Sequence, residues 1–246
     1  MKIKEIYDFL NEIAPFSTAA EWDNTGLCIG SLENSVTTVL LSLDVTHDVI
    51  KKAEETGAEL VLTHHPLLFD AVSVIEEGSV LCEAVRSCKT FISSHTCLDI
   101  AQNGVNDCLA KAVGISNVHS TQEDVFLKIG EVEPCSAEEF AEKIKKALGG
   151  AVTYTDNGGV IKTVAMCSGS GGDLITLAAR VGADAMLTGE AKHHELLEAN
   201  ALGVSLFVAG HYETENIVLN YLKTALEQKF ENLQVEIYSP APAKHI

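Results

Sequence analysis

Positive charge is scarce in this sequence of 246 residues, which has 17 Lys and Arg against 35 Asp and Glu and a formal net charge of −18. Its two arginines are Arg86 and Arg180. Proteins that bind nucleic acid need a broad basic surface to neutralise phosphates, so we expect no nucleic-acid partner. An acidic balance instead favours solubility and attracts metal cations to the surface.

Long apolar runs and paired cysteines are also missing. No segment approaches the roughly 18 apolar residues of a membrane span. The opening MKIKEIYDFLNEI lacks the apolar centre of a signal peptide and is patterned as an amphipathic helix. The seven cysteines form no CxxC pair. We therefore expect a cytoplasmic protein with reduced, mostly buried thiols, and neither a membrane partner nor a zinc ribbon.

The first half of the chain alternates apolar and amphipathic segments. Strands are expected at 36–45, at 58–66 (AELVLTHHP) and at 89–95, where KTFISSH ends near His95. A helix over 46–57 is expected to close at Gly57. Strands that alternate with helices predict parallel βαβ units.

The second half repeats this alternation. Strands are expected at 160–167, 183–190 and 205–211, and a glycine turn (SGSGGD, 168–173) precedes a helix over 174–182. The segment between the halves predicts a strand at 125–132 and a helix after Ser136, whose spacing to Glu139 is that of a capping box. A final helix over 214–230 and a closing strand over 233–238 follow.

The two halves also align with each other. GAELVLTHH at 57–65 matches GADAMLTGE at 182–190, and His95-x-x-x-Asp99 matches His211-x-x-x-Glu215 at an offset of 116 residues. Chance similarity of Gly-Ala-acid turns is the alternative to a shared ancestral plan. The expected fold is α/β, with two similar, interlinked domains whose mixed, largely parallel sheets are flanked by helices. We place the domains at 1–118 and 119–246, with the C-terminal helix able to pack back on the first.

Histidines gather at the predicted strand ends. In open parallel sheets, ligands bind beyond the carboxyl ends of the strands, and His64, His65, His95 and His211 all fall there. Adjacent residues in extended backbone point in opposite directions, so His64 and His65 can reach neighbouring ions. Together with the two His-x-x-x-acid pairs they supply six potential ligands, which fits a dinuclear metal site. Mixed imidazole and carboxylate ligation suits Zn, Fe, Mn, Co or Ni.

Simpler interpretations exist for each motif. A His-His pair is also found in surface loops, and His-x-x-x-Asp is also an ion pair or a helix cap. SGSGGD can hold an anion on its backbone amides or form a tight turn with Asp173 as N-cap. Trp22 and Asn24 can line a substrate pocket or belong to a structural turn. Glu190, His193 and His194 can orient metal ligands or start an ordinary helix.

The motifs EWDNTGL, LTHHPLLF, SSHTCLDI, GSGG, TGEAKHHE and GHYETE, taken in this order, resemble the NGG-interacting-factor-like family. Bacterial members of that family carry the name GTP cyclohydrolase I type 2 homologue. The resemblance runs from Trp22 to Glu215. It implies two divalent transition-metal ions held by residues that match His64, His65, Asp99, His211 and Glu215, with Glu215 bridging both ions.

The resemblance further implies that His95 lies beside the metals, as a further ligand or a catalytic proton-transfer group. It also implies a pair of similar α/β domains and a homohexameric toroid, here in a short form without an inserted domain. From residues and resemblance together, we expect a metal-dependent hydrolase that acts on a small polar substrate or a nucleotide. A phosphoesterase and a non-enzymatic metal-handling or regulatory ring scaffold are the alternatives.

Overall fold

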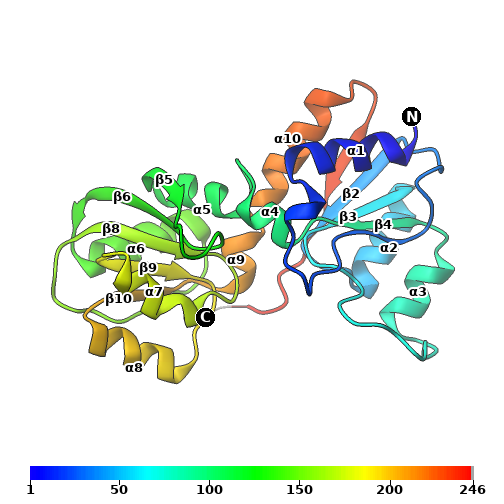
Figure 1. Cartoon of the computed structure of the whole chain (residues 1–246). Helices are drawn as coiled ribbons and strands as arrows, with labels where there is room; N and C mark the ends of the chain where they lie inside the picture. Colours follow the sequence, from blue (N-terminus) through cyan, green and yellow to red (C-terminus); the bar gives the residue numbers. More distant parts are fainter. Residues whose placement is uncertain (245–246) are drawn as a thin grey trace. The chain divides into compact units, whose positions relative to one another are not determined.

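The structure of the chain, a computed structural model, describes residues 1–244 in two compact units (Figure 1). Unit 1 comprises Met1–Gln102 and Leu219–Pro240, and unit 2 comprises Asn103–Val218 and the residues from Ala241. Within the part of the chain that is described, no helix is long and apolar enough to cross a membrane. The α/β fold class predicted from the sequence is confirmed, with two mixed sheets flanked by helices.

Unit 1 is built on a five-stranded sheet in the order β1-β4-β3-β2-β11. Its central strands β2, β3 and β4 are parallel to one another and to β11, whereas the edge strand β1 is antiparallel to β4. The strands are β1 (Gly26–Ile29), β2 (Thr38–Ser42), β3 (Leu60–Thr63), β4 (Thr90–Ser93) and β11 (Gln234–Ile237). β2, β3 and β4 are fully buried, which explains their continuous apolar character.

Helices cover both faces of this sheet. Figure 1 shows α2 and α3 on one face and α1 and α10 on the other. The helices are α1 (Ile3–Ile13), α2 (His47–Thr56), α3 (Val80–Arg86), α4 (Thr96–Ile100) and α10 (Val218–Lys229), with a short 3-10 turn at Phe16–Thr18. α2 ends as predicted, at Gly57, whose φ of 71° is readily adopted by glycine.

Unit 2 is built on a six-stranded sheet in the order β5-β6-β8-β9-β10-β7. Its parallel centre is β8 (Ile161–Cys167), β9 (Ala185–Thr188) and β10 (Ser205–Val208). The antiparallel strands are β5 (Ser116–Ser120), β6 (Lys128–Cys135) and β7 (Thr153–Tyr154). Carboxyl ends of the parallel strands therefore meet at one edge, where the glycine turn and His211 follow.

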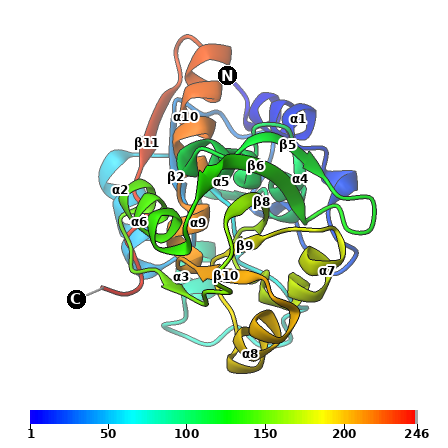
Figure 2. The same cartoon turned by 90° about the vertical axis from the view of Figure 1, so that its left-hand side faces the viewer.

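The helices of unit 2 are divided between the two faces of its sheet, as Figure 2 shows. Phe140 and Leu109 from α6 and α5 pack with Met166 and Leu187 on one face. α7 and α8 bury the opposite face, where Ala178 contributes. The helices are α5 (Val105–Val113), α6 (Ala137–Leu148), α7 (Ile175–Arg180), α8 (His193–Leu202) and α9 (His211–Glu215), with a 3-10 turn at Gly172–Leu174. The predicted Ser136–Glu139 capping box is present.

The division into units differs from the boundary expected between residues 118 and 119. Unit 2 already begins at Asn103, because Leu109 and Val113 of α5 belong to its core. From Leu219 onward, α10 and β11 belong to unit 1, where β11 pairs with β2. The chain thus leaves unit 1 and returns to it.

Two local predictions are wrong. The helix expected over 214–230 is interrupted at Asn216 and Ile217, because the chain passes from unit 2 to unit 1 at this point. All seven cysteines are free, but they are not mostly buried. Cys97 alone is buried, Cys88 is exposed and the other five are partly exposed. Partial exposure follows from peripheral positions, such as Cys28 on the edge strand β1 and Cys135 at the end of β6.

The internal repeat appears in equivalent hydrogen bonds of the two sheets. Glu59 accepts the backbone N–H groups of Thr37 and Thr38 at 3.1 and 3.0 Å. The matching Asp184 accepts those of Lys162 and Thr163, both at 2.9 Å. Each carboxylate thus ties its own strand to the start of the neighbouring parallel strand.

The two His-x-x-x-acid pairs, however, do not occupy equivalent positions in the two units and are shifted by one residue relative to each other. The amide of Ser94 bonds to the carbonyl of Thr63, as the amide of Ala209 does to that of Thr188. In this register His95 corresponds to Gly210, not to His211. His95 accordingly precedes α4 as its N-cap, whereas His211 is the first residue of α9. The offset of 116 residues read from the sequence is therefore wrong by one residue.

Candidate functional site

Three histidines of unit 1 converge at the carboxyl edge of its sheet. His64 and His65 follow β3, and His95 follows the neighbouring parallel strand β4. Their ring centroids are 4.9 to 5.4 Å apart, and one nitrogen of each lies within 4.8 Å of those of the other two. We call His64, His65, His95 and the nearby Asp99 the histidine cluster. The three histidines form a group that can hold a metal ion.

Each of the three rings is oriented through its Nδ1 atom. Nδ1 of His64 lies 2.9 Å from the carbonyl oxygen of Ser94, which can only accept, so this nitrogen carries the proton. Nδ1 of His65 lies 2.7 Å from Asp44 Oδ1, and Nδ1 of His95 lies 3.0 Å from Asp23 Oδ1. In the neutral tautomer that donates from Nδ1, the lone pair is on Nε2. Ligating histidines are typically held in this way.

Asp99 contacts the cluster through His64. Its Oδ1 lies 3.5 Å from His64 Nε2. With the His64 proton on Nδ1, both of these atoms are electron-pair donors, and their proximity favours a cation between or beside them. The donor set therefore fits a divalent metal. Asp99 thus lies next to His64, a residue far from it in the sequence.

Asp23 and Asp44 hold the rings of His95 and His65, a role that the sequence reasoning did not assign to them. Asp23 lies in the EWDNTGL turn and also accepts the backbone N–H of Thr96 at 3.0 Å. Burial raises the pKa of Asp23, but hydrogen bonds from His95 and Thr96 outweigh this and hold it below its ordinary value. Asp23 is thus ionised at neutral pH and fixes the proton of His95 on Nδ1. The position of Asp44 at the end of the first predicted strand was the available signal for its role.

In unit 2, His211 and Glu215 form a contact pair on α9. Because they are four residues apart on a helix, they share one face, and Nε2 of His211 lies 2.9 Å from Oε2 of Glu215. We call them the α9 pair. Nδ1 of His211 lies 3.4 Å from Oε2 of Glu190, which follows β9. Glu190 therefore orients a candidate ligand, one of the two roles open to it from sequence.

Glu190 is itself held in place by the glycine turn. Its carboxylate accepts a hydrogen bond from the hydroxyl of Ser170. This bond, which outweighs the effect of burial, lowers the pKa of Glu190, and the proximity of His211 lowers it further. His193 and His194 behave differently. They begin α8 and are exposed, as expected of an ordinary helix start.

The backbone amides of the SGSGG loop are engaged in hydrogen bonds to side chains of unit 2. The amide of Ser168 donates to Asn106 Oδ1 at 2.8 Å, that of Gly169 to Thr214 Oγ1 at 3.1 Å, and that of Gly171 to Thr188 Oγ1 at 3.0 Å. With these amides engaged, the structure favours the tight turn over an anion cradle. The alternative of a tight turn with Asp173 as N-cap holds only for the turn, because Gly171 occupies the cap position of the 3-10 turn and Leu174 that of α7.

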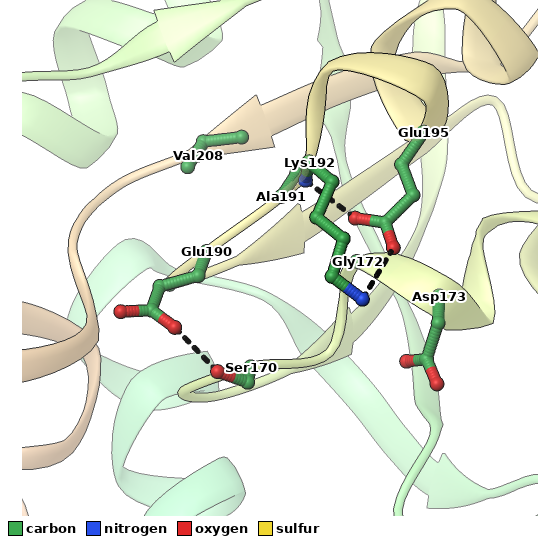
Figure 3. A pocket seen from close by; sticks show the side chains of 9 residues that line it. Ser170, Gly172, Asp173, Glu190, Ala191, Lys192, Glu195 and Val208 are labelled. Atoms are coloured by element: carbon green, nitrogen blue, oxygen red, sulfur yellow. Dashed lines mark hydrogen bonds and ion pairs between the residues drawn. The ribbon is translucent and has the colours of Figure 1, made fainter.

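A cavity of about 460 Å³ opens beside Glu190 in unit 2 (Figure 3). Figure 3 shows Glu190 turned to Ser170 and Lys192 turned to Glu195. Glu195 accepts the backbone N–H of Lys192 at 2.6 Å and so caps α8. The polar part of the cavity wall also includes Asp173, and its apolar part includes Ala191 and Val208. One lysine among three carboxylates is a poor setting for a polyphosphate.

Comparison with known proteins covers nearly the whole chain. The chain is 33% identical over 245 residues to the GTP cyclohydrolase 1 type 2 homolog of Clostridium perfringens, and the alignment covers 94% of each of the two proteins. A protein of the same name from Methanocaldococcus jannaschii is 33% identical over 254 residues, covering 97% of this chain and 99% of its own.

Solved structures agree with these relatives. Staphylococcus aureus protein SA1388 is 29% identical with a TM-score of 0.91, covering 100% of this chain and 99% of its own. Reduced HcgD from Methanocaldococcus jannaschii is 32% identical with a TM-score of 0.86, covering 96% and 97%. The family model described as Duf34/NIF3 (NGG1p interacting factor 3) matches residues 1–242. The chain therefore belongs to the Duf34/NIF3 family.

Proposed function

We propose that this protein is a metal-dependent hydrolase that binds two divalent transition-metal ions and acts on a small polar substrate or a nucleotide. The ligands are His64, His65 and Asp99 of the histidine cluster and His211 and Glu215 of the α9 pair. The observation that carries the proposal is the common orientation of His64, His65 and His95. Each is held at Nδ1, and the three converge within 4.8 Å.

The chemistry of the donors supports transition metals. Imidazole nitrogens suit Zn, Fe, Co and Ni, and carboxylates add harder ligation that Mn also accepts. The partners of the rings support the same role, because Asp44 and the carbonyl of Ser94 set the tautomer that places a lone pair on Nε2. Glu190 gives His211 the corresponding support in unit 2.

The residues also support hydrolysis. A bound divalent ion would acidify water and polarise the bond that is cleaved. His95 would move the proton at its Nε2 atom, and Asp23 would stabilise the imidazolium that forms while it keeps the ring in position. The names of the relatives, GTP cyclohydrolase 1 type 2 homologs, favour a nucleotide substrate. The engaged SGSGG amides give no support to tight triphosphate binding.

Metal stoichiometry tests the first part of the proposal. Elemental analysis of the full chain should find two transition-metal ions per chain. His64→Ala and His211→Ala should each lose metal, and His119→Ala, an exposed histidine on β5 outside both groups, should retain two ions. A wild-type chain without metal, or unchanged stoichiometry in both ligand variants, would contradict the proposal.

A turnover screen tests the second part. Metal-loaded protein would be assayed against nucleotides and phosphodiesters, so that ring hydrolysis and the alternative phosphoesterase activity are both detectable. His95→Asn should keep its metal and lose on the order of 100-fold or more in turnover. If no substrate is turned over, the hydrolase proposal fails and a non-enzymatic metal-handling or regulatory role is favoured. Light scattering of the same samples would test the expected hexamer.

A further inference from the structure

Two exposed aromatic rings flank His95 in unit 1. The ring of Trp22 lies 5.8 Å from that of His95, and the ring of Phe69 lies 5.7 Å from it, both centroid to centroid. Trp22 is 65% exposed and Phe69 is 50% exposed. Exposure of this extent leaves a large apolar surface in water, which is costly for the protein alone.

The turn that carries Trp22 is rigid on both sides of it. The amide of Ala20 donates to Thr96 Oγ1 at 2.9 Å, and Asp23 holds both His95 and Thr96. The hydroxyl of Thr25 accepts the amide of His95 at 3.2 Å. These bonds fix the backbone around Trp22 to the residue that the proposed reaction uses. The position of the indole beside His95 is therefore set by a turn that hydrogen bonds hold in place.

Phe69 is connected to the same turn. The side-chain amide of Asn24 donates to the carbonyl of Leu68 at 2.7 Å, directly before Phe69. Two segments separated in the sequence thus bring one ring each to His95. Its bond to Leu68 gives the Asn24 side chain a role in positioning Phe69. From the sequence, Asn24 could be assigned only to a substrate pocket or to a structural turn.

We propose that Trp22 and Phe69 form a stacking site for a planar aromatic heterocycle, such as a purine or pterin ring, on the substrate handled at His95. This inference rests on the proposed function, because it takes His95 to be the residue next to the reacting group. Both rings lie within 5.8 Å of the His95 ring, centroid to centroid, so a planar group bound beside His95 has an aromatic face within reach. Every planar heterocycle has a face that can stack on an aromatic side chain, whatever its ring atoms are. The site therefore selects a class of ligand and not one particular base.

Non-aromatic ligands fit these surroundings poorly. A sugar offers the two aromatic faces only the C–H groups of a puckered ring, a smaller stacking surface than that of a planar heterocycle. The ionised Asp23 beneath this face is buried and adds negative potential, and the chain carries a formal net charge of −18, so a phosphate finds no positive side chain of this turn to pair with. The heterocycle is therefore the part of a nucleotide that this site recognises.

Trp22 reports on its own environment, because it is the single tryptophan of the chain. The test is a fluorescence titration of the full-length, metal-loaded protein with guanosine, adenosine and neopterin, with ribose and tripolyphosphate as probes that lack a heterocycle. Free N-acetyltryptophanamide corrects for absorption by the probes. We expect saturable quenching by at least one heterocycle and none by ribose or tripolyphosphate. Quenching by none of the three heterocycles, or equal quenching by ribose, would overturn the inference.

Calorimetric titration of variants with the best heterocycle then tests the two rings. Phe69→Ala and Trp22→Ala should each weaken binding on the order of tenfold, whereas Trp22→Phe should lose less because it keeps a ring. Leu197→Ala is the matched control, since Leu197 is 57% exposed but lies on α8 in unit 2. Wild-type affinity in both alanine variants would contradict the assignment.

Failure of this inference can be told from failure of the proposed function. If the heterocycles bind through Trp22 and Phe69 but nothing is turned over, the stacking site stands and the hydrolase proposal does not. If the protein holds two ions and hydrolyses a substrate while Trp22→Ala and Phe69→Ala keep full affinity for it, the hydrolase stands and the stacking site is wrong.

Discussion

Gly169 lies so close to Glu215 that a β-carbon on it would stand 2.1 Å from Oε1 of the carboxylate. The same β-carbon would lie 3.3 Å from Cε1 of His211. Glycine at this position of the SGSGG loop therefore leaves room for both members of the α9 pair. Its φ of +60° adds a second reason, because left-handed backbone disfavours other residues.

Gly169→Ala should therefore weaken metal binding by about 10- to 100-fold, because the methyl group displaces the carboxylate of Glu215. Competition with a chromogenic chelator measures the affinity. Gly158→Ala is the matched control, since Gly158 also has positive φ (+76°) but no atom within 4 Å of the added carbon. Both variants should lose about 1–2 kcal/mol of stability from the left-handed backbone. Equal metal affinity in the two variants would show that Glu215 is not a ligand.

Asp23→Asn should release the ring of His95 from its single tautomer. The amide that replaces the carboxylate is a weaker acceptor for Nδ1–H, and hydrogen bonds to charged groups contribute about 1.5–3 kcal/mol. Nitrogen-15 NMR of the imidazoles should show the protonated nitrogen of His95 changing from Nδ1 towards a mixture. Asp44→Asn should produce the same change in His65 and leave His95 as it is. Unchanged His95 shifts in Asp23→Asn would mean that another group orients the ring.

Glu59 should make the stability of unit 1 depend on pH. Burial raises the pKa of Glu59, but hydrogen bonds from Thr38 and Thr37 outweigh this, so its pKa lies below the ordinary value in the folded state. A lowered folded pKa gives stability that is present above the unfolded pKa of about 4.3 and lost as the pH falls through the folded pKa. Glu59→Gln should cost on the order of 1 kcal/mol at pH 7, a figure reduced for partial exposure.

Chemical denaturation at pH 7, 5 and 3 measures this effect. The difference in unfolding free energy between wild type and Glu59→Gln should shrink as the pH falls below about 4.3. Glu55→Gln, on the exposed surface of α2, should show no such trend. A difference that is constant over the whole range would show that the carboxylate charge contributes nothing at Glu59.

The sequence predicted those features that depend on local pattern. Buried parallel strands are apolar throughout, so β2, β3 and β4 were recognisable, and Gly57 marked the end of α2. Histidines at strand ends were recognisable because the ends of parallel strands meet at one edge. Asp23 was not assigned, because its contact with His95 joins residues 72 positions apart. Hydrogen bonds between distant side chains leave no periodic signal in a single sequence.

The remaining errors have a similar cause. The one-residue step between His95 and His211 depends on where α4 and α9 begin, and helix starts are set by tertiary contacts as well as by local residues. The sequence also left open whether the last helix packs on the first domain, as it does from Leu219 onward. The pattern of a helix shows that one face is buried, but not which partner covers that face.

Gly189 explains why only the first half of the repeat carries adjacent histidines. It corresponds to His64, but a β-carbon there would meet Gly169 O and Thr214 Oγ1 at 2.7 Å and His211 Cα at 2.8 Å. Two of these atoms are backbone, and Thr214 is held by its bond from the Gly169 amide. No side chain can enter without moving α9 away from the loop.

Gly189→Ala should therefore destabilise the protein by about 1–3 kcal/mol through overpacking, and it should weaken metal binding because His211 is displaced. Gly159→Ala is the control, since the three atoms nearest to its added carbon all belong to the exposed side chain of Asn157, the first at 3.1 Å, and none is backbone. Urea denaturation and metal competition of the two variants provide the comparison. A Gly189→Ala protein as stable and as metal-binding as Gly159→Ala would show that α9 adapts to a side chain at this turn, and the asymmetry of the two halves would then need another cause.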